Sequence, residues 1–225
     1  MKNKITFLVL LFVSFGFAQT KPNEVTKPNK TLKTNATVTL LVDGNWSLGA
    51  NWSGGSVPTS GDDVIIPNGL TLFLNITNAV ANSLTVDNGG VMQISTGQAL
   101  TVTNGFVNNG TFTIKSNVSS SGSFITGTSS GSITYERFLA GGVNKWHLVG
   151  APVAGHTLSN FVGTYGAAMT QSGVKYSLAP YDNTGIIDVS TWKHYTIDGS
   201  NPAPATAFVQ GKGYEILMNA SQTVN

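Results

Sequence analysis

Residues 81–115 read ANSLTVDNGGVMQISTGQALTVTNGFVNNGTFTIK, in which short apolar runs alternate with clusters of Asn, Gly, Ser and Thr. The runs recur about every six to twelve residues, a spacing too short for intervening helices and typical of strands joined by tight turns. The wider segment 75–134 contains no proline, and Asp87 and Lys115 are its only charged residues. This pattern predicts an all-β protein.

Two all-β architectures fit this rhythm. An antiparallel sandwich has strands about eight to twelve residues apart with clean alternation of polar and apolar residues. A short parallel β-helix, or solenoid, has three short strands and about twenty residues in each coil. Its stacked coils place equivalent side chains in ladders, where like charges would repel each other. Because segment 75–134 is poor in charge and rich in Asn, Ser and Thr, we predict a solenoid.

The composition divides the chain into four expected segments. Residues 1–18 form a signal peptide, residues 19–37 a disordered linker, residues 38–134 a β-helix-like domain and residues 135–225 a β-sandwich-like domain. The last segment holds most of the aromatic residues and all three histidines. A sandwich usually needs more strands than follow here, so we expect the chain to be the front part of a longer product.

The N-terminus has the order of a secretory signal peptide. Lys2 and Lys4 precede an apolar run over residues 5–17, and cleavage is expected after Ala18. No later segment approaches the ~20 apolar residues of a membrane-spanning helix, so we expect a secreted or outer-surface protein that does not span the membrane. The two leader lysines account for the formal net charge of +2. This balance argues against a nucleic-acid partner, because phosphate binding needs clustered Lys and Arg.

The protein has no cysteine, which excludes disulfides, thiolate metal sites and a cysteine nucleophile. His147, His156 and His194 are its histidines, and none lies in an HExxH motif or at metal-ligand spacing from another. We therefore expect no metal, no other cofactor and no catalytic site built on histidine.

Residues 44–69 read GNWSLGANWSGGSVPTSGDDVIIPNG. This segment resembles the opening of autotransporter-type β-helix passengers, in which Trp, Asn-Trp, Gly-Gly, Pro and Gly-Asp precede a strand. It is also similar to the start of the G8 domain, in which a Trp pair and a Pro-Gly turn precede the first strand. The resemblance implies a β-helix and leaves the activity open. It is carried by Trp46, Asn51, Trp52, Gly54, Gly55, Pro58, Gly61, Asp62 and residues 64–67.

Residues 135–138 (YERF) and 145–153 (KWHLVGAPV) form a second motif. They are similar to a module of secreted Bacteroidota proteins that carry a type IX sorting domain at the C-terminus. This resemblance implies export by the type IX route of a Gram-negative bacterium. The sequence departs from the pattern of these proteins in showing no sorting domain up to Asn225, so this route is expected only if the sequence is truncated.

We expect the N-terminal motif to be structural. Its members are Trp46, Trp52, Gly54, Pro58, Asp62 and Asp63. The two tryptophans are close enough in sequence to fold onto one end of the first β layer and cap the solenoid. The two aspartates could supply oxygen ligands to Ca²⁺, but no other acidic residue lies near them in sequence. A turn cap before the following strand is therefore favoured.

Four aromatic residues are candidates for ligand binding: Trp146, Tyr181, Trp192 and Tyr195. Aromatic faces offer apolar area beside a polar tip and can stack on sugars. The alternative is that these residues form the core of the second domain. We favour the core for the tryptophans and leave both possibilities open for the tyrosines.

These features predict a secreted or cell-surface structural and adhesive protein. Its extended surface would make many shallow contacts with an extracellular polysaccharide or a cell-surface component. The alternative is a polysaccharide-active enzyme, a hydrolase or lyase on a β-helix scaffold. A hydrolase would need two carboxyl groups in one cleft, drawn from Glu136, Asp182, Asp188, Asp198 and Glu215.

Overall fold

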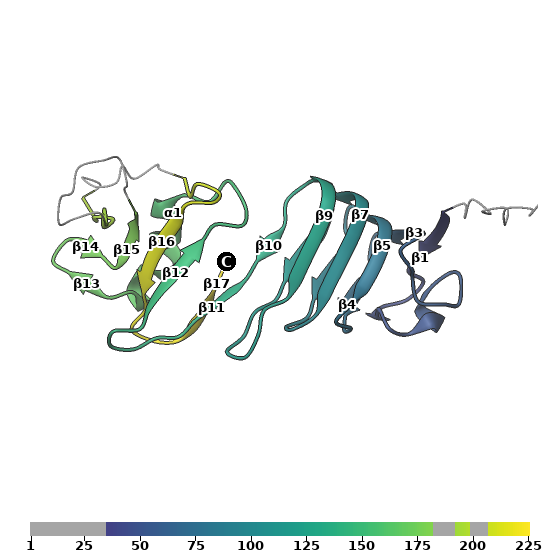
Figure 1. The fold of residues 1–225 in the computed structure, drawn as a ribbon, viewed down its shortest axis with the longest axis horizontal. Helices are drawn as coiled ribbons and strands as arrows, with labels where there is room; N and C mark the ends of the chain where they lie inside the picture. The colour runs from purple at the N-terminus through teal and green to yellow at the C-terminus, as the bar shows by residue number, and fades with distance from the viewer. Residues whose placement is uncertain (1–34, 182–191, 199–206) are drawn as a thin grey trace, which may run out of the picture. The chain divides into compact units, whose positions relative to one another are not determined.

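The computed structural model describes residues 35–181, 192–198 and 207–225. Its first ten strands alternate between two sheets, and every neighbouring pair within a sheet is parallel (Figure 1). One sheet contains β1 (Ala36–Thr39), β3 (Asp62–Ile66), β5 (Ala79–Val86), β7 (Ala99–Asn108) and β9 (Ser123–Ser130). The other contains β2 (Gly44–Asn45), β4 (Thr71–Leu74), β6 (Val91–Ile94), β8 (Thr111–Ile114) and β10 (Thr134–Tyr135).

These strands wind as a parallel β-solenoid of about 3 turns. The prediction of an all-β fold with a solenoid is confirmed, since helix makes up 8% and strand 50% of the structure. The coils of β5 and β7 each have one short strand and one long strand, and a register shift divides the long strand, between Ala81 and Ser83 in β5 and between Val102 and Gly105 in β7. Each of these coils thus contains the three short paired segments that were predicted. A short turn joins the two sheets, in which the Gly90 backbone N–H donates a hydrogen bond of 2.8 Å to the Asp87 carbonyl oxygen. The predicted signal peptide and most of the predicted linker lie outside the described residues.

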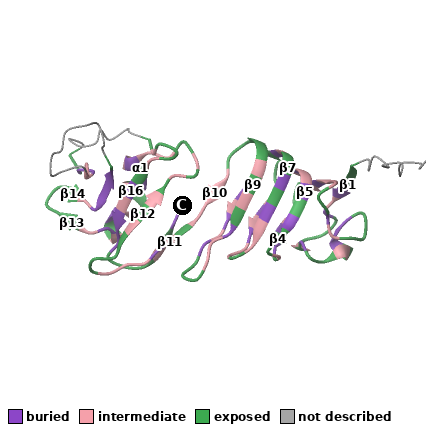
Figure 2. Ribbon diagram, in the orientation of Figure 1, coloured by how far each residue is buried: buried purple, intermediate pink, exposed green. Residues whose placement is uncertain are grey.

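Inward-pointing side chains form columns along the solenoid. The strand register aligns Leu72, Met92 and Phe112 in one column, and all three side chains are buried. Figure 2 shows buried and more exposed residues alternating along β5 and β7. This period of two is the geometry of a strand with one face on the core. The apolar pairs that predicted strands in the sequence are therefore the residues that fill the solenoid.

Glycine at the solenoid corner allows neighbouring turns to stack closely. A Cβ atom on Gly110 would lie 2.3 Å from the carbonyl oxygen of Gly90 and 2.4 Å from that of Asp87. No side chain fits at such a distance from backbone atoms. Gly89 has φ of +79°, a conformation that other residues rarely adopt. The Asn-Gly clusters of the sequence thus set the corner at which β5 leads into β6 and β7 into β8.

A ladder of polar side chains crosses the sheet of β3, β5 and β7. Asn82 Nδ2 and Ser83 Oγ donate hydrogen bonds to Asp63 Oδ1 at 2.7 and 2.6 Å, and Asn104 Nδ2 donates to Asn82 Oδ1 at 2.5 Å. The hydrogen bonds from Ser83 and Asn82 lower the pKa of the Asp63 carboxyl group from its ordinary value. Asp63 therefore connects two coils as a carboxylate.

The lowered pKa of Asp63 predicts a pH-dependent contribution to stability. Because the folded-state pKa lies below the unfolded value of ~3.9, the contribution is fully present above that value and is lost as pH falls through the folded-state pKa. We expect the stability difference between the parent and Asp63→Asn to shrink as pH falls from about 6 to about 2 in urea denaturation. Ser83→Ala keeps the carboxylate but removes one donor, and should show a weaker pH dependence than the parent. A difference between parent and Asp63→Asn that stays constant with pH would contradict this assignment.

The N-terminal motif packs into the first coil. Trp46 and Trp52 are buried, with ring centroids 5.2 Å apart in an edge-to-face arrangement, and Trp52 Nε1 donates a hydrogen bond of 2.9 Å to the Trp46 carbonyl oxygen. Pro58 is buried and Gly54 is exposed in the loop that returns to β3. Asp62 Oδ2 accepts hydrogen bonds from the backbone N–H and the hydroxyl group of Thr59, both at 2.7 Å. The motif also includes the short 3₁₀ helix η1 (Gly49–Asn51).

Antiparallel pairs follow the solenoid in the chain. The helix α1 (Leu158–Tyr165) lies among them. Thr157 caps its N-terminus, because the Thr157 hydroxyl group accepts a hydrogen bond of 3.1 Å from the Asn160 backbone N–H. The three-stranded sheet consists of β12 (Trp146–Gly150), β16 (Gly213–Leu217) and β15 (Leu178–Pro180). The two-stranded pairs are β11 (Arg137–Leu139) with β17 (Gln222–Val224) and β13 (Gln171–Ser172) with β14 (Lys175–Tyr176), and the helices are α1 (Leu158–Tyr165) and the 3₁₀ helix η2 (Gly166–Ala168).

A second hydrophobic cluster lies among these elements. It includes Leu139, Phe161, Tyr214 and Ile216, and is separate from the cluster inside the solenoid. The described residues do not form a clear two-layer sandwich, so the predicted β-sandwich stays a prediction. In the part of the chain that the structure describes, no helix has the length and hydropathy needed to cross a membrane.

Candidate functional site

The register of the three-stranded sheet places an aromatic residue and two glycines on one face. Directly opposite residues of antiparallel strands point to the same side. Trp146 lies opposite Leu217, Leu148 opposite Glu215, and Gly150 opposite Gly213. Ala179 of β15 also lies opposite Glu215. We call this side of β12, β16 and β15 the aromatic face.

Residues 192–196 extend the aromatic face beyond β15. The backbone N–H groups of Lys193 and Tyr195 donate to the carbonyl oxygens of Pro180 and Leu178 at 3.2 and 2.8 Å, and Tyr181 forms a β-bridge with Trp192. This antiparallel register brings Tyr181 and Trp192 onto the aromatic face, with their ring centroids 5.1 Å apart and their planes at 65°.

The aromatic side chains of this face are accessible to solvent. Trp146 is 46% exposed and Tyr181 is 44% exposed, whereas Trp192 is half-buried. The Trp146 ring centroid lies 6.3 Å from that of His194. The face therefore carries two exposed ring surfaces, Trp146 on β12 and Tyr181 with Trp192 beyond the end of β15.

Glu215 and His194 supply the charged groups of the aromatic face. His194 Nε2 lies 3.5 Å from Glu215 Oε1, and both side chains are partly buried. Burial raises the pKa of the Glu215 carboxyl group, and the nearby His194 partly opposes this rise. The pair can donate and accept hydrogen bonds while adding little net charge when both groups are ionised.

Tyr195 is separate from the other three predicted ligand-binding residues. It follows His194 in the chain, so strand alternation turns its side chain to the opposite side of the sheet. There it is 6% exposed and belongs to the second hydrophobic cluster. The structure thus brings Trp146, Tyr181 and Trp192 to one face and leaves Tyr195 in the core. The prediction that the tryptophans form the core is wrong for Trp146, because its position on β12 turns it away from the second hydrophobic cluster.

Several members of the aromatic face were not among the predicted site residues. Leu148, Gly150 and Gly213 are brought there by pairing between segments far apart in the chain. Alternate residues of a strand point to the same side, so the sequence 146–150 by itself would have placed Leu148 and Gly150 on the same side as Trp146. No local pattern identifies Gly213 as the residue opposite Gly150. Asp182 and Asp188, the acidic residues considered for catalysis near this segment, lie outside the described residues.

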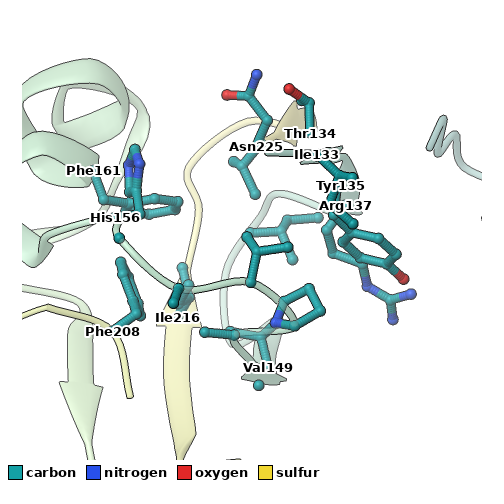
Figure 3. A pocket seen from close by; sticks show the side chains of 18 of the residues that line it. Ile133, Thr134, Tyr135, Arg137, Val149, His156, Phe161, Phe208, Ile216 and Asn225 are labelled. Atoms are coloured by element: carbon teal, nitrogen blue, oxygen red, sulfur yellow. The ribbon is translucent and has the colours of Figure 1, made fainter. Parts of the chain in front are cut away.

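A cavity of about 740 Å³ lies beside β11, α1 and β16, and its lining includes Leu148 and Gly150 of the aromatic face (Figure 3). Leu139, Phe161, Phe208 and Ile216 give it an apolar lining, and His156 also borders it. The His156 ring lies 6.0 and 6.2 Å from the rings of Phe161 and Phe208, and its Nε2 atom is buried without a hydrogen-bond partner among the described residues. Polar side chains, among them Arg137 and Asn225, line the cavity as well.

The structure shows no cluster of metal-binding side chains among the residues that it describes. Within residues 35–181, 192–198 and 207–225, no three His, Asp or Glu side chains come close enough to hold an ion together. The carboxylates of Asp62 and Asp63 are occupied by the turn and ladder hydrogen bonds described above.

These features define a β-solenoid protein whose chain continues into a small antiparallel sheet with an exposed aromatic face. The chain belongs to the family described as a domain of unknown function (DUF8693), whose model matches residues 38–225. No curated protein and no solved structure matches the chain.

Proposed function

We propose that this chain is an exported structural and adhesive protein of the bacterial surface that contacts glycans through its aromatic face. The observation that carries the proposal is the placement of Trp146, Tyr181 and Trp192 on one accessible side of a sheet. Aromatic rings exposed to this extent lose favourable apolar burial, which a stacked sugar ring would restore. The neighbouring pair of Glu215 and His194 would exchange hydrogen bonds with sugar hydroxyl groups.

The solenoid supports the same function as a rigid spacer. Its outward-facing residues on β5 and β7 include Val80, Thr85, Thr101 and Val107, which are uncharged. Such a surface would add many weak contacts along a polymer, and their combined strength would exceed that of a single site.

Export is proposed from the leader sequence and from the resemblance to type IX secretion cargo. Both concern the compartment and not the ligand. Mass spectrometry of the protein recovered from the cell surface or the medium tests the proposed export. We expect a mature chain that begins at Gln19.

Trp146→Ala and Tyr181→Ala are expected to weaken glycan binding about tenfold each, equivalent to ~1.4 kcal/mol. The measurement is affinity electrophoresis of the full chain in gels containing β-glucan, xyloglucan, galactomannan or alginate, followed by calorimetry on any polysaccharide that retards the parent. Phe73→Ala is a matched control, because Phe73 is an exposed aromatic residue of the solenoid strand β4. Equal binding by the parent and both variants would contradict the proposed site.

A polysaccharide-active enzyme is the second candidate, favoured by the raised pKa of Glu215. A general acid in glycoside hydrolysis needs a carboxyl group that keeps its proton near the working pH. The same polysaccharides distinguish the two functions: an adhesive protein leaves their chain length unchanged, whereas a hydrolase releases reducing ends and a lyase releases unsaturated ends.

A further inference from the structure

Gly150 and Gly213 lie directly opposite each other on neighbouring strands of the aromatic face. Glycine weakens a strand, because it loses more conformational freedom on folding than other residues and has no side chain to pack. Glycine in a strand often marks a bulge or a place where a ligand or another chain approaches the backbone closely.

The fold itself does not require glycine at these two positions. Neither residue has the positive φ that favours glycine. A Cβ atom on Gly213 would meet nothing within 4 Å, and one on Gly150 would meet only the Lys212 carbonyl oxygen at 3.8 Å. The described residues therefore leave open space above this pair, in contrast to Gly110, where neighbouring backbone excludes any side chain.

Recognition groups surround this open space. The Tyr181 backbone N–H donates to the Gly213 carbonyl oxygen at 3.3 Å, so the exposed Tyr181 ring begins beside Gly213. Glu215 lies two residues further along β16, a distance of about 7 Å, and Leu148 lies opposite Glu215. The two glycines thus leave a stretch of bare backbone, which we call the trough, with the Tyr181 ring beside it and a carboxyl group within the span of one sugar ring.

We propose that the trough over Gly150 and Gly213 is a subsite for one pyranose ring of a neutral glycan. The inference rests on the proposed glycan-binding function. It adds where one sugar ring binds and that the bound sugar carries no charge. The ring lies against the backbone of β12 and β16, contacts Tyr181 with its apolar edge, and donates a hydroxyl hydrogen bond to Glu215. A neutral sugar fits because the Glu215 carboxyl group accepts hydrogen bonds from sugar hydroxyl groups and, when ionised, repels an acidic sugar such as a uronate.

Gly213→Val tests the trough without removing any binding group. Valine is favoured in strands, and its side chain would enter open space, so the thermal midpoint should equal or exceed that of the parent. Its two methyl groups would occupy the trough, and we expect at least a tenfold loss of affinity for whichever of β-glucan, xyloglucan and galactomannan the parent binds. Gly213→Ala should cause a smaller loss, since its methyl group fills less of the trough.

Gly54→Val is the matched control, because Gly54 has equally open surroundings and no positive φ but lies in the N-terminal motif. Its binding should equal that of the parent. If Trp146→Ala and Tyr181→Ala weaken binding while Gly213→Val binds like the parent, the proposed subsite is rejected, but the proposed binding by the aromatic face is retained. A Gly213→Val midpoint well below the parent would show that the glycine is structural, and a parent that prefers alginate would overturn the neutral ligand. A parent that binds none of the polysaccharides rejects the proposed function and the subsite with it.

Discussion

Replacement of Trp52 by alanine is expected to lower the free energy of unfolding by about 3–5 kcal/mol, the usual cost of truncating a buried tryptophan. Trp52 is 1% exposed, meets Trp46 edge to face, and bridges to Leu40 at the start of the solenoid. Its indole N–H also satisfies the Trp46 carbonyl oxygen. The substitution would leave a cavity and an unpaired buried acceptor in the terminal coil, which has a neighbouring coil on one side alone.

Urea denaturation followed by far-UV circular dichroism measures this loss without depending on tryptophan fluorescence. Trp52→Phe should lose less stability, because it keeps a ring but not the N–H donor. Trp146→Ala is the matched control for tryptophan removal, since Trp146 is 46% exposed, and its stability should change by less than about 1 kcal/mol. Glycan binding by the folded fraction of Trp52→Ala should persist. A variant that unfolds like the parent but no longer binds would instead make Trp52 part of the ligand site.

The solenoid could be predicted because its determinants are local. Each coil repeats a short apolar pair such as Leu84 and Val86, a turn with Asn-Gly, and a second pair such as Met92 and Ile94. Parallel strands of adjacent coils pair in register, so repetition along the sequence becomes stacking in space.

The aromatic face could be predicted only in part. Its aromatic residues were recognisable as candidates, but their grouping depends on long-range pairing between β12, β16 and β15, which local patterns do not encode. One element of the grouping was available: Trp192 and Tyr195 are an odd number of residues apart, so a regular strand places them on opposite faces. The opposition of Gly150 to Gly213 and the ion pair between His194 and Glu215 join segments too distant in sequence to be paired by any local rule.

The short helix α1 shows a different limit. Thr157 is a favoured N-cap residue, yet the helix that follows spans only Leu158–Tyr165 and includes Gly163 and Thr164, which are weak helix formers. Such a short segment is marginal by itself. Its buried residues, Leu158 and Phe161, pack into the second hydrophobic cluster, so tertiary packing stabilises a helix that the local sequence does not specify.

Phe112→Ala is expected to lower the free energy of unfolding by about 3–5 kcal/mol, because Phe112 packs against two other phenylalanines, Phe106 and Phe124, inside the solenoid. Its ring centroid lies 4.8 Å from that of Phe106 and 4.9 Å from that of Phe124, and Phe112 itself is 1% exposed. Aromatic residues thus fill both ends of the solenoid core, whereas the coils between them are filled by aliphatic residues and Met92. The strands that carry Phe106 and Phe112 are paired on both sides, whereas Phe124 lies on β9 at the edge of its sheet.

A double-mutant cycle with Phe106→Ala separates the ring contact from burial alone. The two substitutions should be non-additive, with a coupling of about 0.5–1.5 kcal/mol for the edge-to-face pair. Phe112→Leu keeps most of the apolar volume and should lose less stability than Phe112→Ala, while Phe73→Ala on the outside of β4 should change it little. Urea denaturation at constant pH measures all five proteins against the parent. If Phe112→Ala lay within about 1 kcal/mol of the parent, the coil that carries Phe112 would not be part of the cooperative fold.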